Sequence, residues 1–211
     1  MIEIIIGDIR KIDANRYATY LEKLPLWMRE NVLKYRVQED RYRTLLGKII
    51  LLDYLQKHTQ YNLENIYLNK FKKPYLQNTP FHFSISHSGN FTVVIFAKTI
   101  VGIDIEKVNY NITLNDYKEI FLPKELNMIE NSKDKIKQFY KIWTIKEAIL
   151  KAHGDGFMRN PKEVLINDTK AYCENVTYNI HSFEYYEYIL AIAYEKDENI
   201  VLDNFNMTHF L

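Results

Sequence analysis

Residues 82–106, HFSISHSGNFTVVIFAKTIVGIDIE, decide the fold that we expect for this chain. The alternation of apolar and polar residues over 81–86 predicts a strand with one buried face. After turn-forming residues at 88–90, the apolar run 91–97 is typical of a strand buried on both faces. Residues 101–106 alternate again after a second reversal of the chain. The stretch therefore predicts a three-stranded meander.

The last of these strands carries two carboxylates, Asp104 and Glu106. Residues two apart in a strand point to the same side and lie roughly 7 Å apart, so we expect both acids on one face. Two neighbouring acids repel, and a divalent cation that prefers oxygen ligands, such as Mg²⁺, would relieve that repulsion. A solvent-facing polar edge gives the same pattern. The pair alone leaves both interpretations open.

Composition limits the class of protein. The 211 residues allow one domain or two small ones, and 28 basic residues nearly balance 27 acidic ones, so no overall field favours nucleic acid or a charged membrane. A single cysteine, Cys173, excludes an internal disulfide and fits a reducing compartment. The chain shows no signal peptide and no apolar run of about 18 residues. We expect a cytoplasmic protein without nucleic-acid or membrane partners.

The first half offers cations beside a predicted helix. Residues 2–6 read as a buried strand, 13–24 as a short helix and 39–56 as a largely buried helix. Arg41, Arg43 and Thr44 would fall near the start of the last, where the helix dipole disfavours basic groups and favours a bound anion. Ordinary surface arginines would fit equally well. Lys73, held extended by the following proline, would lie in a loop.

Residues 136–153, IKQFYKIWTIKEAILKAH, form the clearest predicted helix, and Gly154 supplies its end. Tyr140, Glu147 and Lys151 share one side of it. Glu147 and Lys151 are four residues apart, so they could form a surface ion pair that contributes about 0.3–0.5 kcal/mol. Alternatively, Glu147 is a third oxygen ligand for a metal ion and Lys151 binds phosphate.

Several motifs together resemble a known family. SISHSG, GIDIEK and WTIKEAILKAHGDG, in this order, are similar to the three signature motifs of the Sfp-type 4′-phosphopantetheinyl transferases. EDRYRTLLGK and KKPYL upstream also resemble stretches of that family, so the resemblance covers nearly the whole chain. Five ordered matches are far more specific than any one of them, and their structural context tests them.

The resemblance implies a reaction and a fold. Such enzymes transfer the 4′-phosphopantetheine arm of coenzyme A to a serine of an apo acyl or peptidyl carrier protein, with Mg²⁺, and release 3′,5′-ADP. This is holo-acyl-carrier-protein synthase activity, and the Sfp-like length favours nonribosomal peptide or polyketide (antibiotic) biosynthesis. The implied fold is α+β, with two similar halves at 1–104 and 105–211, the active site in the cleft between them, and a complete site in one monomer.

The resemblance also assigns residues. The metal ligands would be Asp104, Glu106 and Glu147, and Lys151 would hold the pyrophosphate. Glu147 is also the candidate general base, acting directly or through a metal-bound water. Arg43 and His87 would bind the 3′-phosphate of coenzyme A, and Thr44, Lys73 and Ser86 would add contacts to the nucleotide.

The chain departs from the family pattern at the nucleotide contacts. Met28 and Asn31 stand where some members carry lysines. The positive charge that would bind the nucleotide there is therefore absent or comes from Arg29 or Lys34. Lys48 stands where some relatives have an acid, which the sequence does not explain.

Two other functions stay open from the sequence. One is a different magnesium-dependent enzyme acting on nucleotides or phosphate esters, with the same three acids. The other is a catalytically silent module that binds carrier proteins. The choice of carrier would depend on surface contacts, for which the polar segment 107–125 is a candidate.

Overall fold

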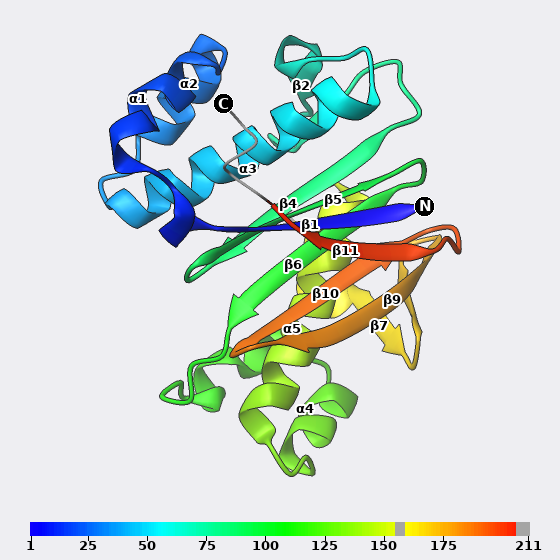
Figure 1. The fold of residues 1–211 in the computed structure, drawn as a ribbon. Coiled ribbons are helices and arrows are strands. Elements are labelled where there is room, and N and C mark those ends of the chain that lie inside the picture. The colour runs from blue at the N-terminus through cyan, green and yellow to red at the C-terminus, as the bar shows by residue number, and fades with distance from the viewer. Residues whose placement is uncertain (155–158, 206–211) are drawn as a thin grey trace. The chain divides into compact units, whose positions relative to one another are not determined.

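The computed structural model describes residues 1–154 and 159–205 and divides the chain into two units (Figure 1). The first unit joins Met1–Lys98 to the C-terminal segment from Asn199, and the second unit is Thr99–Glu198. The sequence placed the boundary between residues 104 and 105 and assigned the whole C-terminal half to one domain. The structure differs because the strand that carries Asp104 pairs inside the second unit, while the last strand returns to the first.

The first unit contains a four-stranded sheet in the order β11-β1-β5-β4 and a separate β2-β3 hairpin. β11 is parallel to β1, and the other neighbours are antiparallel. Its elements are β1 (Ile2–Asp8), η1 (Ile9–Lys11), η2 (Ala14–Arg16), α1 (Tyr17–Glu22), α2 (Leu26–Leu33), α3 (Gln38–His58), η3 (Leu63–Asn65), β2 (Ile66–Leu68), β3 (Pro74–Leu76), β4 (His82–Ser88), β5 (Phe91–Ala97) and β11 (Ile200–Asn204).

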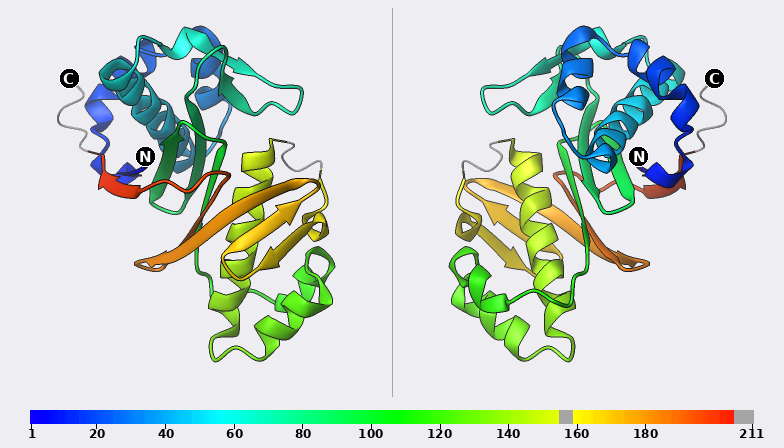
Figure 2. Two further views of the ribbon diagram at one scale, coloured as in Figure 1. Left: turned by 90° about the vertical axis from the view of Figure 1, so that its right-hand side faces the viewer. Right: turned by 90° about the vertical axis from the view of Figure 1, so that its left-hand side faces the viewer.

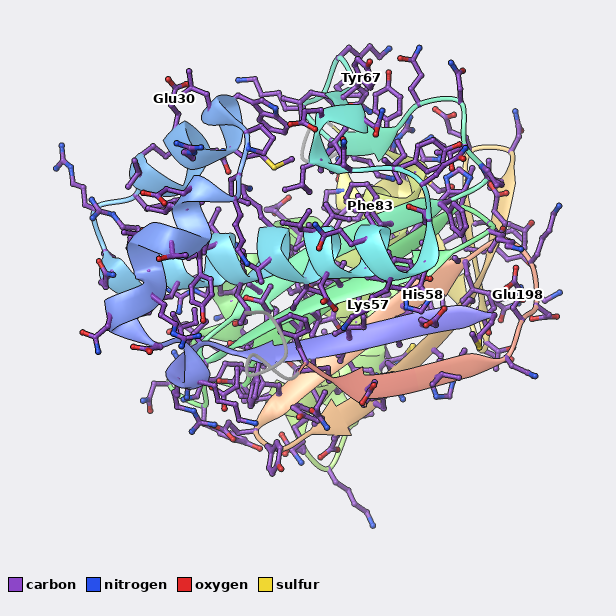
Figure 3. The ribbon with its side chains drawn as sticks, turned by 45° about the horizontal axis from the view of Figure 1, so that its top comes forward. Glu30, Lys57, His58, Tyr67, Phe83 and Glu198 are labelled. Atoms are coloured by element: carbon purple, nitrogen blue, oxygen red, sulfur yellow. The ribbon has the colours of Figure 1, made fainter. Side chains whose placement is uncertain are left out.

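Helix α3 lies across one face of this sheet, and Figure 3 shows it with Lys57 and His58 toward its carboxyl end and Phe83 of β4 nearby. Its apolar residues form the core of the unit together with those of the strands and of α2. Gly47 marks the closest approach, because a Cβ there would lie 3.1 Å from Ile85 Cγ2 and 3.3 Å from Thr92 Cγ2. The helix expected over 39–56 is confirmed.

The second unit is a five-stranded antiparallel sheet in the order β6-β10-β9-β8-β7. Both views in Figure 2 show α5 along one face of this sheet, where it packs on β6 and β10. The elements are β6 (Val101–Lys107), η4 (Leu114–Ile120), α4 (Pro123–Glu130), α5 (Lys135–His153), η6 (Pro161–Glu163), β7 (Val164–Asn167), β8 (Lys170–Cys173), β9 (Val176–Tyr185) and β10 (Tyr188–Tyr194).

The predicted meander is correct for two strands and wrong for the third. β4 and β5 form a hairpin, and every residue of β5 is buried as expected. β6 instead pairs with β10, which is far away in sequence. Alternating residues predict that a strand forms but not which neighbour it takes, so the pattern could not show that β6 belongs to another sheet.

Helix α5 begins and ends as the sequence predicts. The Asp134 side chain accepts a hydrogen bond from the Lys137 N–H, and Gly154 ends the helix with φ 96° in the left-handed region that glycine favours. The last two residues of the third motif, Asp155 and Gly156, lie outside the described residues.

The α+β class with two similar halves is confirmed, since each unit places one long helix on a mainly antiparallel sheet. The helix expected over 13–24 is shorter, with η2 followed by α1. No helix in the part of the chain that the structure describes is long and apolar enough to cross a membrane.

Candidate active site

The second unit brings α5 and β6 together at Gly102. A Cβ added to Gly102 would lie 1.9 Å from the Ala148 carbonyl oxygen and 2.5 Å from the Ala152 nitrogen, so the helix backbone rests directly on the strand. This contact places the side chains of Glu147 and Lys151 beside Asp104, two residues further along β6. Gly102 has a positional role that the residue-by-residue assignments missed. The glycine inside a strand pattern, at the start of GIDIEK, was the available signal.

Lys151 pairs with Asp104 rather than with Glu147. Its Nζ lies 2.7 Å from Asp104 Oδ1, and the Asp104 side chain is almost completely buried. The surface ion pair between Glu147 and Lys151, one of the two interpretations of their spacing, is therefore not what forms.

Glu147 is a buried acid with an unusual pKa. Its side chain is 6% exposed, and its Oε1 atom has no hydrogen-bond partner among the described residues. Burial raises the pKa of Glu147 to about 7, with further upward contributions from the charges of Asp104 and Glu106 and an opposing one from Lys151. The carboxyl group therefore titrates close to neutral pH.

Glu106 completes the acidic set that the sequence predicted. It lies two residues after Asp104 on β6 and is half-buried. Its charge acts on Glu147 and also on Tyr140, whose pKa is raised mainly by burial. The structure thus brings Asp104, Glu106, Glu147 and Lys151 into one electrostatically coupled group.

This donor set fits a divalent cation in its chemistry. The ligands are carboxylate oxygens, they repel one another, and the buried Glu147 Oε1 atom lacks a partner. Within residues 1–154 and 159–205, no three His, Cys, Asp or Glu side chains are placed so that they alone could hold a metal ion. Mg²⁺ does not require one, since it usually keeps several waters and takes further ligands from substrate phosphates.

In the first unit, Arg43 joins α3 to the turn between β4 and β5. Its guanidinium donates hydrogen bonds to the Gly89 carbonyl and to Asp40, and the Thr92 hydroxyl donates to the Arg43 carbonyl at 3.1 Å. The helix begins at Gln38, with acids at Glu39 and Asp40 in its first turn. The expected conflict between basic groups and the helix dipole is therefore largely absent, because Arg43 lies one turn further in and faces Asp40.

His87 lies on the same side of the hairpin as Arg43. It is directly opposite Thr92, whose methyl group faces α3, and paired residues in antiparallel strands share a face. His87 is exposed there, while the buried Ser86 is paired with Val93 on the other face. Arg43 and His87 therefore lie on one face of the sheet, and the Ser86 side chain lies on the other.

Thr44 and Lys73, the other two residues expected to contact the nucleotide, differ in their hydrogen bonds. The Thr44 hydroxyl oxygen is buried and makes no hydrogen bond within the described part of the chain. Lys73 follows a tight loop in which its N–H donates to Asn69 Oδ1 at 2.9 Å and its carbonyl accepts from the Asn69 N–H at 2.9 Å. Burial lowers the pKa of Lys73 to about 8.

The positions that depart from the family pattern also find an explanation. Met28 is a core residue, and Arg29 is engaged with the carbonyl groups of Leu24 and Glu22, both at 2.8 Å. Lys48 donates to Asn31 Oδ1 at 3.1 Å, and burial and then Lys34 lower its pKa to about 8. Positive charge beside Asn31 therefore comes from Lys48 and Lys34 rather than from Arg29.

Comparisons with known families cover both units. The profile described as 4′-phosphopantetheinyl transferase superfamily matches residues 100–197. A second profile, described as 4′-phosphopantetheinyl transferase, N-terminal, matches residues 13–99. The junction between the two matches lies within two residues of the structural boundary at Lys98.

Individual relatives agree with the profiles. The chain is 34% identical over 134 residues to 4′-phosphopantetheinyl transferase Sfp of Bacillus subtilis strain 168, and the alignment covers 61% of this chain and 59% of the relative. It is 32% identical over 128 residues to 4′-phosphopantetheinyl transferase gsp of Aneurinibacillus migulanus, covering 59% and 53%. It is 30% identical over 124 residues to the L-aminoadipate-semialdehyde dehydrogenase-phosphopantetheinyl transferase of Schizosaccharomyces pombe, covering 50% and 48%.

The aligned part of the chain thus spans between 48% and 59% of the length of these relatives. The two profiles, however, follow one another across both structural units and carry the same family description. The chain belongs to the 4′-phosphopantetheinyl transferase superfamily.

Proposed function

We propose that this protein transfers the 4′-phosphopantetheine arm of coenzyme A to a serine of an apo acyl or peptidyl carrier protein, with Mg²⁺, and releases 3′,5′-ADP. The observation that carries the proposal is the group formed by Asp104, Lys151 and Glu147 where α5 meets β6. It combines a cation for phosphate with a buried carboxyl group that titrates near neutral pH. Family membership supports the same reaction.

The reaction replaces one bond to phosphorus by another. The serine oxygen bonds to the phosphorus that carries the pantetheine arm, and the bridging P–O bond of the pyrophosphate breaks, so that 3′,5′-ADP leaves with the electron pair. Such transfers depend mainly on positioning and charge neutralisation rather than on a covalent enzyme intermediate. The residues on α5 and β6 offer both.

Glu147 is the proposed base. Its pKa of about 7 is that of the metal-free protein, and Mg²⁺ on the same carboxylate would lower it. With the metal bound, Glu147 would be ionised and could accept the serine proton directly or through a water molecule. Lys151 would bind a pyrophosphate oxygen and stabilise the charge that develops on the leaving group. Asp104, Glu106 and Glu147 would hold Mg²⁺, which supplies further neutralisation of the pyrophosphate when bound.

We propose that the first-unit residues bind the nucleotide of coenzyme A. Arg43 and His87 lie at one end of one sheet face, as a shared 3′-phosphate would require. Thr44 offers a buried hydroxyl without a partner in the described structure, and Lys73 a half-buried ammonium on a tight loop. Ser86 faces the other side of the sheet, so any contact it makes would be separate from that of His87.

The carrier protein would be recognised in part by the segment 107–125. Tyr110 and Tyr117 are exposed there, and the same segment leads into α4. We further propose that the protein acts as a cytoplasmic monomer, with peptidyl or polyketide carriers of antibiotic biosynthesis as its first candidates. The carrier class is decided by experiment.

Intact-mass spectrometry tests the function directly. An apo peptidyl carrier protein is incubated with the protein, coenzyme A and Mg²⁺, and a second sample contains EDTA. We expect the carrier to gain one phosphopantetheine group, and EDTA to abolish the gain. Folded protein that modifies none of several apo carriers would refute the proposal and favour another phosphate-ester enzyme or a silent carrier-binding module.

A further inference from the structure

Lys146 is a completely buried lysine immediately before Glu147. Its side chain is 0% exposed, and its Nζ lies 2.8 Å from Glu125 Oε1. The same Nζ donates hydrogen bonds to the carbonyl oxygens of Pro161 at 2.8 Å and Val164 at 3.0 Å. The contact with Glu125 Oε1 is an ion pair without hydrogen-bond geometry, so Lys146 is held by this ion pair and by two hydrogen bonds to carbonyl groups.

These contacts tie three segments of the second unit together. Glu125 lies in the first turn of α4, and its Oε2 accepts the Leu122 N–H at 2.8 Å. Pro161 and Val164 belong to η6 and the start of β7. Lys146 therefore connects α5 to α4 on one side and to the β7 end of the sheet on the other.

Stability is a weak explanation for this ion pair. Removing both charges from water is costly, and well-packed apolar residues of similar volume often stabilise a core as much or more. A buried ion pair together with two hydrogen bonds to backbone carbonyl groups does fix the geometry of the elements that carry it. The ion pair therefore points to a geometry that the second unit has to keep.

Glu147 needs a fixed place, because the charges of Asp104 and Glu106 act against its own. A helix that could turn about its axis would move Glu147 away from these acids and relieve the repulsion. Successive residues on a helix point about 100° apart, so anchoring Lys146 in its own direction fixes the rotation of α5 and with it the direction of Glu147. The Gly102 contact sets the spacing of helix and strand, while a glycine offers no side chain to resist rotation.

We infer that Lys146, through Glu125 and the carbonyl groups of Pro161 and Val164, is a positioning residue that holds Glu147 and Lys151 against Asp104. The inference rests on the proposed function, in which these side chains bind the metal and the pyrophosphate. Lys146 itself touches neither the substrate nor the reacting atoms.

The test removes both buried charges together. The double variant Lys146→Met with Glu125→Gln avoids leaving one charge buried alone, and the glutamine oxygen still accepts the Leu122 N–H. The matched control is Lys135→Met with Glu130→Gln. That pair joins the same two helices at 2.7 Å but is exposed to solvent.

Three quantities are measured for each protein: the midpoint of thermal unfolding, kcat and KM for coenzyme A, and the Kd for Mn²⁺ as a probe of the acidic set. For the buried double variant we expect a midpoint close to that of the wild type, a fall in kcat of about tenfold or more, a KM within about threefold, and Mn²⁺ binding weakened about tenfold. The control should match the wild type in all three.

The outcomes separate this inference from the proposed function. A folded double variant with wild-type kcat and Mn²⁺ affinity would show that Lys146 has only a structural role. If the wild type binds Mn²⁺ but modifies no carrier, the proposed function fails, and the Mn²⁺ affinities still decide the positioning role. A wild type that neither binds Mn²⁺ nor modifies a carrier would overturn both.

A second double variant, Lys146→Gln with Glu125→Gln, covers the case in which the first does not fold. It also removes both buried charges, and the new amide at position 146 can still donate to a carbonyl group. We expect kcat to fall about threefold with KM unchanged, and unchanged kcat would contradict the role of the ion pair.

Discussion

The two units solve one architectural problem in different ways. Each packs a long helix on a mainly antiparallel sheet. In the first unit the close contact lies between Gly47 of α3 and the side chains of Ile85 and Thr92, whereas in the second it lies between Gly102 of β6 and the backbone of α5. The charges differ as well. Arg43 and Lys48 on α3 have neutralising or polar partners in Asp40 and Asn31, whereas α5 and β6 gather acids that repel one another. In the proposed function, the cations of the first unit bind the nucleotide, and the residues on α5 and β6 of the second unit perform the transfer.

The largest expected difference between the units concerns the two glycines. In Gly102→Ala the new methyl group would meet the Ala148 carbonyl at 1.9 Å, and backbone cannot yield as a side chain does, so we expect a loss of about 3 kcal/mol or more in the free energy of unfolding. In Gly47→Ala the neighbours are methyl groups at 3.1 and 3.3 Å, and the gain in helix propensity of about 1 kcal/mol offsets the crowding. Urea denaturation compares the two, and equal losses would contradict this account of helix contact.

The second prediction separates chemistry from binding. For Lys151→Ala we expect kcat to fall about 100-fold or more, because the leaving group loses its cation, with the fold retained. For Arg43→Ala we expect KM for coenzyme A to rise about tenfold with kcat nearly unchanged, because the variant loses one charge-assisted contact with the nucleotide.

Steady-state kinetics with a carrier protein measure both variants, and circular dichroism controls for folding. Unaltered kcat in Lys151→Ala would remove its role with the pyrophosphate. A large kcat effect in Arg43→Ala would contradict the division of roles between the units.

The third prediction concerns the stability cost of Glu147. The pKa of this acid is about 7 in the folded state and near 4.5 when exposed, so the folded state binds the proton more tightly. The stabilisation from that proton is complete below about pH 4.5 and is lost as the pH rises through 7. Glutamine does not ionise, so the Glu147→Gln variant does not lose stability in this way as the pH rises. In EDTA we expect the variant to be more stable than the wild type by about 1–3 kcal/mol at pH 8 and by clearly less at pH 5.

Urea denaturation at the two pH values measures this difference. Glu163→Gln, on the surface of the same unit, serves as the control that removes an acid without a buried charge. A stability difference for Glu147→Gln that does not change with pH would contradict the raised pKa.

The sequence predicted the parts of the fold that depend on local pattern. The helix over 39–56, the buried strand 91–97 and the end of α5 at Gly154 follow from spacing and capping residues, and all three form. The partners of β6 and β11 could not be predicted, because pairing between residues far apart in the chain depends on packing that one strand does not encode.

The candidate site shows the same limit. The spacing of Glu147 and Lys151 along one helix was compatible with an ion pair between them. In the structure, Lys151 instead pairs with the carboxylate of Asp104 on β6. Lys146 stands in a motif whose residues were read for metal and phosphate, and only tertiary contacts with Glu125, Pro161 and Val164 show that it is fully buried. The opposite orientations of Ser86 and His87, by contrast, follow from strand alternation and could have been predicted.

The smallest predicted effect belongs to Thr44 in the first unit. Its buried hydroxyl has no hydrogen-bond partner in the described part of the chain, so Thr44→Val removes an unsatisfied polar atom and keeps the shape of the side chain. We expect the free energy of unfolding to stay the same or to rise by up to about 1 kcal/mol, since the deleted group makes no contact to lose. If the hydroxyl contacts coenzyme A, KM should rise about two- to threefold with kcat unchanged, the size expected for one neutral hydrogen bond. Chemical denaturation and coenzyme A titrations decide the matter together: a variant that is less stable would show that the hydroxyl has a partner in the free protein, and an unchanged KM would remove Thr44 from the nucleotide contacts while leaving Arg43 and His87 in place.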